Sequence, residues 1–154
     1  MRSIFFTFAL ATILLMGFAS VSLADNGLIS KKSKHSAVET IDRLEAVLKK
    51  KGINVVARVS HTKAAEGAGV KIRPTELIIF GNPKLGSNMF TSNQLAGIDL
   101  PMKALAWEDD KGQVWITYND PAYVANRHGI KDRDEVVKKM SGALDNLTSK
   151  AAGD

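Results

Sequence analysis

The side chains best suited to acid–base or metal chemistry are three histidines, His35, His61 and His128. They lack HxH, HxxxH and HExxH spacing, so a metal or haem site would require the fold to gather them. His61 and His128 fall near predicted loops, where imidazole commonly serves as a general base or a ligand. An enzyme built on either histidine would need a nearby carboxylate, namely Asp99, Glu108 or Asp120.

A second group of polar residues falls in the segment 81–87, which the sequence predicts to be a loop. The segment follows an apolar run and precedes a predicted helix, a position where backbone N–H groups can hold an anion. It lacks the Gly-Lys-Ser/Thr and GxGxxG patterns, and Pro83 removes one donor. We therefore expect an ordinary turn here rather than a phosphate site.

Several polar and aromatic side chains cluster at the predicted ends of strands rather than within them. If those ends meet in the fold, they would line one pocket together with His61 and His128. The expected binding residues are Phe80 as an apolar wall with Asn82, Asp99, Tyr118, Asn119, Asp120, His61 and His128. No residue is assigned a catalytic or metal-binding role.

These side chains must be positioned by alternating strands and helices. Period-2 alternation and turn residues predict five strands, at 27–34, 53–59, 70–80, 100–107 and 113–118. Helical spacing and capping residues predict helices at 36–51, 61–66, 88–96, 121–128 and 132–148, with a frayed tail from residue 149. Only the first and last of these helices are long and amphipathic.

This order of elements predicts an α+β fold. The two main helices each have one apolar face, and both must cover one face of a curved mixed or antiparallel sheet. The other helices are short insertions. Neither an internal repeat nor a linker interrupts the chain after residue 25, so we expect a single domain over 25–154 with its core at about 27–148.

Composition excludes several classes of protein. The 154 residues are 45% hydrophobic and 24% charged, which is typical of one globular domain. The chain has no cysteine, which rules out disulfides, thiol nucleophiles and thiolate metal sites. The net charge of +5 is spread among acidic residues, so we expect no nucleic-acid groove.

The first 24 residues resemble an export signal. Arg2 precedes an almost wholly apolar run from Ile4 to Val21, and Ser22-Leu23-Ala24 supplies the small residues that a signal peptidase reads. We expect cleavage after Ala24, which leaves a soluble periplasmic or secreted domain with no stable membrane anchor. The rival interpretation is a retained transmembrane helix.

Six phrases, in order along the chain, resemble the domain of unknown function 302 family. They are Glu39-Thr40-Ile41-x-x-Leu44, Pro74-Thr75-Glu76-Leu77, Phe80-Gly81-Asn82-Pro83-Lys84-x-Gly86, Asp99-Leu100-Pro101, Trp107-Glu108-Asp109 and Val114-Trp115-x-x-Tyr118-Asn119-Asp120-Pro121. The resemblance covers nearly all of 27–148. It implies a TATA-binding-protein-like domain, a curved sheet carrying two helices, often dimeric, with no established catalytic activity.

The expected function is therefore a non-enzymatic module, without a cofactor, that binds a small ligand or a protein partner. A second copy of the chain is among the expected partners, through an exposed sheet edge or face. The alternatives are an enzyme that uses His61 or His128 as a general base, and metal or haem binding through His and Met side chains.

Overall fold

A computed structural model describes residues 26–154, and the predicted export signal at 1–24 lies outside this range. The elements along the chain are β1 Leu28–Lys32, α1 Ala37–Lys50, β2 Asn54–Ser60, α2 His61–Gly67, β3 Thr75–Gly81, α3 Pro83–Ser92, the 3-10 helix η1 Gln94–Ile98, β4 Met102–Glu108, β5 Val114–Asn119, α4 Pro121–Arg127 and α5 Asp134–Ala152. None of the helices in the described range is both long and apolar enough to cross a membrane.

The strands form one antiparallel sheet in the order β1-β5-β4-β3-β2. Since β3 and β5 both run antiparallel to β4, they run parallel to each other and end at the same end of the sheet. The register places Phe80 of β3 opposite Met102 of β4, and Tyr118 of β5 opposite Ala104 of β4. The start of β4 therefore lies between the ends of its two neighbours.

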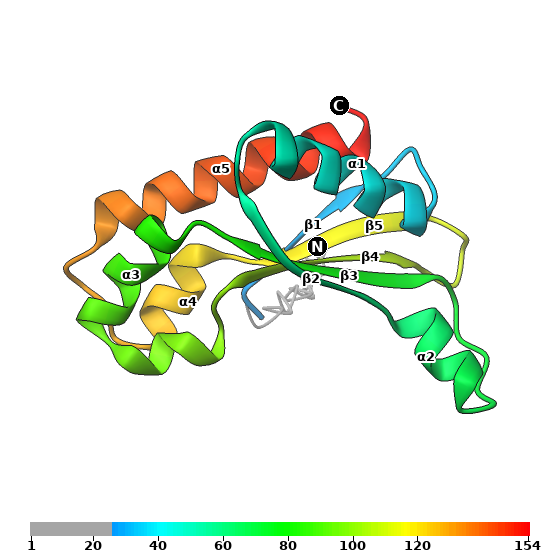
Figure 1. The fold of residues 1–154 in the computed structure, drawn as a ribbon, viewed down its shortest axis with the longest axis horizontal. Coiled ribbons are helices and arrows are strands. Elements are labelled where there is room, and N and C mark those ends of the chain that lie inside the picture. The colour runs from blue at the N-terminus through cyan, green and yellow to red at the C-terminus, as the bar shows by residue number, and fades with distance from the viewer. Residues whose placement is uncertain (1–25) are drawn as a thin grey trace, which may run out of the picture.

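Helices α1 and α5 lie side by side on one face of this sheet (Figure 1). The apolar stripe of α1 includes Ile41, Leu44 and Leu48, which have no exposed surface, and α5 contributes Leu144 and Leu147. The inward-facing residues of the central strands pack against these helices and complete the core. This arrangement confirms the predicted α+β fold, because each long helix can bury its stripe only against the sheet and the other helix.

Local end signals fix α1 as predicted. The Ser36 hydroxyl accepts a hydrogen bond from the Glu39 backbone N–H at 3.2 Å, which starts the helix. Gly52 follows the last turn at a φ of 64°, a left-handed conformation that suits glycine. The hairpin of β4 and β5 and the helix that begins at Pro121 are likewise confirmed.

Several predicted boundaries are wrong, among them the start of the strand predicted at 70–80, because β3 begins at Thr75. Residues 81–87 do not form a loop, because Asn82 caps a helix that begins at Pro83 and runs to Ser92. The tail does not fray at residue 149, because Ala151 and Ala152 are fully buried and hold α5 in place to its end. Asp132 does not cap α5 but accepts a hydrogen bond from Ser92.

The opposite face of the sheet is not covered by α1 or α5 (Figure 1). Its central strands place Leu77, Ile79, Leu105, Trp107 and Trp115 there, all half-buried. The two tryptophans lie directly opposite each other across β4 and β5, so they shield one another in part. The sheet thus has one dry face and one partly exposed apolar face.

Candidate functional site

Two corners of similar sequence stand at one end of the sheet. Strand β3 ends in Phe80-x-Asn82-Pro83 and strand β5 ends in Tyr118-x-Asp120-Pro121, and each corner starts a helix. The side-chain oxygens of Asn82 and Asp120 each accept a backbone N–H two residues ahead, both at 2.9 Å. Proline at the first helical position suits both starts because its missing N–H would have no partner there.

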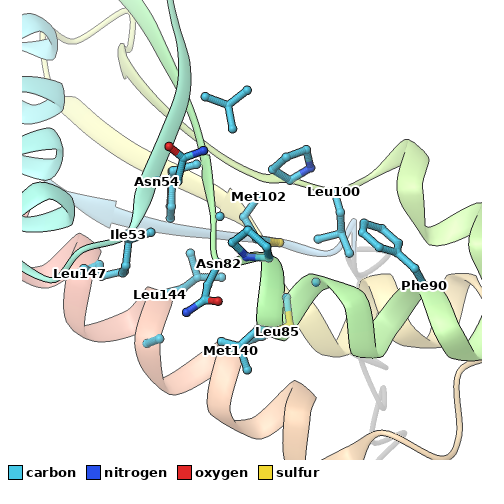
Figure 2. A pocket seen from close by; sticks show the side chains of 17 residues that line it. Ile53, Asn54, Asn82, Leu85, Phe90, Leu100, Met102, Met140, Leu144 and Leu147 are labelled. Atoms are coloured by element: carbon cyan, nitrogen blue, oxygen red, sulfur yellow. The ribbon is translucent and has the colours of Figure 1, made fainter.

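A pocket of about 280 Å³ opens beside the first corner. Figure 2 shows its walls: Met140, Leu144 and Leu147 from α5, Leu85 and Phe90 from α3, and Leu100 and Met102 at the start of β4. The end of β3 and the residues Ile53 and Asn54 before and in β2 complete the lining. A preformed hollow with mostly apolar walls is how small-molecule sites are usually built.

The polar content of the pocket is small. Among the described residues that line it, the polar side chains are Asn54 and Asn82, and none of the lining side chains is charged. Both asparagines are exposed, so they lie at the mouth rather than in the depth of the pocket. The cap bond uses the Asn82 carbonyl oxygen and leaves its amide N–H groups able to donate to a ligand.

Of the predicted binding residues, Phe80 and Asn82 line this pocket. Tyr118 occupies the equivalent position on β5 and is as buried as Phe80, both at 3% exposed, but it is not part of the lining. Thr148 of α5 lies close to its phenol. Burial raises the pKa of the Tyr118 phenol, and the nearby Asp145 carboxylate raises it further.

Asn119 and Asp120 are also outside the pocket lining, because the second corner uses them structurally. Asn119 pairs with Leu28 in the sheet. The Asp120 backbone N–H donates to the carbonyl of Gly27 at 2.8 Å, while its carboxylate caps α4. Both residues join the edge strand β1 to the start of α4.

Asp99 and His128 form a pair of their own. The Asp99 Oδ2 and His128 Nε2 atoms are 2.6 Å apart, and the two side chains are 13% and 8% exposed. The pair connects the end of η1 to the end of α4, and Arg127 adds a longer, exposed contact to the same carboxylate. Neither member lines the pocket, although Leu100 and Pro101, which follow Asp99, do.

His61 lies at the other end of the sheet, which corrects the expectation that it shares a pocket with Asn82. Strand β2 starts at the pocket end, where Asn54 pairs with Gly81, and finishes where Ser60 pairs with Glu76. His61 begins α2 just beyond Ser60. A strand of seven residues spans roughly 20 Å, so this separation follows from the antiparallel pairing.

Sequence reasoning missed the pocket residues of α5 and those at the start of β2. Met140, Leu144 and Leu147 belong to an apolar stripe that predicted core packing. That stripe carries no local signal to separate a residue in the core from one that lines a hollow. Within residues 26–154, no three His, Asp or Glu side chains come together in a way that could hold a metal ion.

Two comparisons with known proteins agree on one family. The family model described as "Domain of unknown function DUF302" matches residues 29–147. A solved structure, an uncharacterized conserved protein DUF302 from Bacillus stearothermophilus, superposes with a TM-score of 0.65 at 21% identity, over 82% of this chain and 96% of that one. At this identity the likeness concerns the fold.

Curated relatives carry a different kind of name. Proteins called fluoride-specific ion channel FluC 1, from Brucella suis biovar 1 (strain 1330) and Brucella abortus biovar 1 (strain 9-941), are each 46% identical over 134 residues. The match covers 86% of this chain but 53% and 50% of those proteins. The chain therefore spans about half the length of these relatives.

Proposed function

This chain belongs to the DUF302 family, named for a domain of unknown function, and from that premise we propose that it is a non-enzymatic domain that binds a small apolar ligand. The ligand would occupy the pocket between α3, α5, the end of β3 and the start of β4. The observation that carries the proposal is a hollow of about 280 Å³ whose walls are almost wholly apolar.

Removing a ligand's apolar surface from water supplies the driving force. At about 25 cal/mol per Å² of buried apolar area, a ligand that buries roughly 250 Å² would gain about 6 kcal/mol before the entropic cost of binding. The pocket volume is near the lower end of the range for ligand sites, about 300–1,000 Å³, so the ligand should be small. Catalysis is not part of the proposal, because the lining residues within 26–154 include no acid, base or nucleophile able to act at neutral pH.

A fluorescent apolar probe tests binding. N-phenyl-1-naphthylamine is dark in water and bright in an apolar site, so its emission should rise with added protein and saturate. Ala143 lines the pocket from an exposed position on α5, and the variant Ala143→Trp should block the mouth and abolish the signal. Asn146→Trp adds the same side chain at an exposed α5 position outside the pocket lining and should leave binding unchanged.

Equal binding by both variants would place the probe elsewhere and refute the proposed site. A lack of binding by the unmodified protein would refute the function itself. Circular dichroism of both variants checks that each one is folded.

Export is part of the same proposal. We infer that residues 1–24 direct the chain out of the cytoplasm and are removed after Ala24, so the domain meets its ligand in the periplasm or outside the cell. Intact-mass measurement of protein purified from its own cells should give a chain that begins at Asp25. A mass that includes the first 24 residues would contradict cleavage.

A second candidate comes from the curated relatives. Their name and their 46% identity to this chain favour a domain that acts beside a fluoride channel, with the channel as its protein partner. Addition of this protein to vesicles containing the Brucella suis protein should then change the rate of fluoride efflux, read with a fluoride electrode. An unchanged rate would reject this candidate.

A second copy of the chain is the other protein partner that we expected. Light scattering tests this possibility by measuring the mass of the particle in solution.

A further inference from the structure

We propose that the ligand of this pocket is a single-chain carboxylate, with its alkyl chain in the pocket and its anionic head group at the mouth. This inference rests on the proposed function and adds the chemical class of the ligand. The occupant is a free fatty-acid-like molecule rather than a membrane lipid, because a pocket of about 280 Å³ suits one short chain.

The depth of the pocket suits an alkyl chain. Met102, Met140 and Leu144 are at most 7% exposed and form its inner wall. Methionine side chains are unbranched and flexible, so they adapt to a chain of variable length. Because no charged side chain of the described residues lines the pocket, we place the head group at the mouth rather than inside.

Three lysines stand next to or near lining residues of the pocket along the chain. Lys84 lies between the lining residues Pro83 and Leu85, and Lys139 precedes the lining residue Met140. Lys139 also borders a shallow depression that shares Leu85 with the pocket. Lys51 is two residues before the lining residue Ile53.

These three lysines are exposed, and none is paired with a carboxylate in the described part of the chain. Among the other lysines of the described residues, Lys31, Lys34 and Lys49 have a carboxylate partner, whereas Lys63 and Lys111 also lack one. The positive charge at the mouth is thus available to an incoming anion.

Other groups near the mouth do not cancel this charge. Glu135 borders the same depression as Lys139, together with Lys138, so that depression has one acid for two bases. Lys103, next to Met102, already donates to the carbonyl oxygens of Asp99 and Pro101 and is not counted here. At the mouth itself, the amide groups of Asn54 and Asn82 can donate hydrogen bonds to a carboxylate.

Displacement of the bound naphthylamine probe gives the test. Decanoate, decanol and decyltrimethylammonium share one chain length and differ in head-group charge. Decanoate should displace the probe at a concentration at least about fivefold lower than decyltrimethylammonium, since a few exposed charge pairs are worth about 1 kcal/mol together. Octanoate and dodecanoate report the chain length that the pocket accepts.

Charge reversal locates the head group. The double variant Lys84→Glu/Lys139→Glu should lose the preference for decanoate while it still binds the neutral probe. The matched variant Lys63→Glu/Lys111→Glu changes the net charge equally, on α2 and on the β4–β5 turn at the other end of the sheet. It should keep the preference, and 0.5 M NaCl should weaken it in the unmodified protein.

The outcomes separate the two proposals. Probe binding without a head-group preference, or an equal effect of both double variants, would overturn the carboxylate and leave the apolar site. Failure of the probe to bind would overturn both. Co-sedimentation with phosphatidylglycerol vesicles, combined with no displacement by decanoate, would assign the site to membrane lipid and also overturn the inference.

Discussion

The two Asx-Pro corners of this domain have the same local construction but different surroundings. At each corner an inward aromatic residue, Phe80 or Tyr118, precedes the capping residue by two positions. At each corner the cap bond measures 2.9 Å and proline occupies the first helical position. The corners diverge only in what packs behind them.

The second corner is filled. Pro121, Val124 and Ala125 of α4 are buried, and the ring of Tyr123 lies so close to Gly27 that a Cβ there would be 2.2 Å from it. Tyr118 is buried and lies close to Thr148 of α5. Helix α3 at the first corner buries Met89 alone, and its Leu85 and Phe90 face the pocket. One corner therefore supports the fold, and the other leaves room for a ligand.

The largest expected difference between the corners is the loss of stability when an apolar side chain of α4 or of α3 is shortened to alanine. Val124→Ala should lower the free energy of unfolding by about 2–3 kcal/mol, because it removes two buried methyl groups and leaves a cavity. Leu85→Ala should cost about 1 kcal/mol or less, because Leu85 is half-buried beside an existing hollow. Urea unfolding measures both, and equal losses would mean that α3 is as tightly packed as α4.

A smaller effect concerns the link between the corners. Asp99→Ala and His128→Ala should each cost about 1–2 kcal/mol, and the double variant should cost less than their sum by about 1 kcal/mol. The reason is that each single variant leaves the other side chain, 8–13% exposed, without its main partner. Urea unfolding of the two single variants and the double variant measures these losses. If the losses are additive, the two side chains do not stabilise each other.

The two caps should contribute about equally. Asn82→Ala and Asp120→Ala should each reduce stability by about 1 kcal/mol, since each removes one acceptor from a helix start. Asn82→Ala should in addition weaken decanoate binding, which Asp120→Ala should not. Thermal unfolding measures the loss of stability, and probe displacement measures decanoate binding. A loss of decanoate affinity in Asp120→Ala would show that both corners contribute to one binding site.

The smallest effect is expected at alkaline pH. Burial raises the pKa of Tyr118 above that of the unfolded chain, so its contribution to stability is complete below the unfolded value of about 10 and is lost as the pH rises through the folded value. Between pH 9 and 11 the unmodified protein should lose more stability than Tyr118→Phe. The exposed Tyr123→Phe is the control, and it should behave like the unmodified protein.

Much of the fold was predictable because its signals are local. The capping serine of α1, the proline and aspartate that start α4 and the alternation in β4 and β5 each act within a few residues. The Asn82 corner was misjudged as a loop although its start resembles that at Asp120. Its glycines at 81 and 86 and its sparse apolar stripe suggested a turn, whereas the buried Met89 holds the segment as a helix.

The candidate site was predictable only in part. Phe80 and Asn82 belong to a recognisable strand end, and they line the pocket. Tyr118 has the same local pattern, yet α5 covers it, and no rule about neighbouring residues could reveal that. His61 looked equivalent to His128 in the sequence, but strand direction placed them at different ends of the sheet.

The amino-acid sequence by itself determined the family, the absence of thiol chemistry, the order of strands and helices and most of their ends. These properties depend on composition and on contacts between residues a few positions apart. The tertiary structure alone decided which strand end is filled and which is hollow. That choice depends on how α5 crosses the sheet: Thr148 lies close to Tyr118, whereas Met140, Leu144 and Leu147 line a space beside Phe80, since packing joins residues that are far apart in the chain.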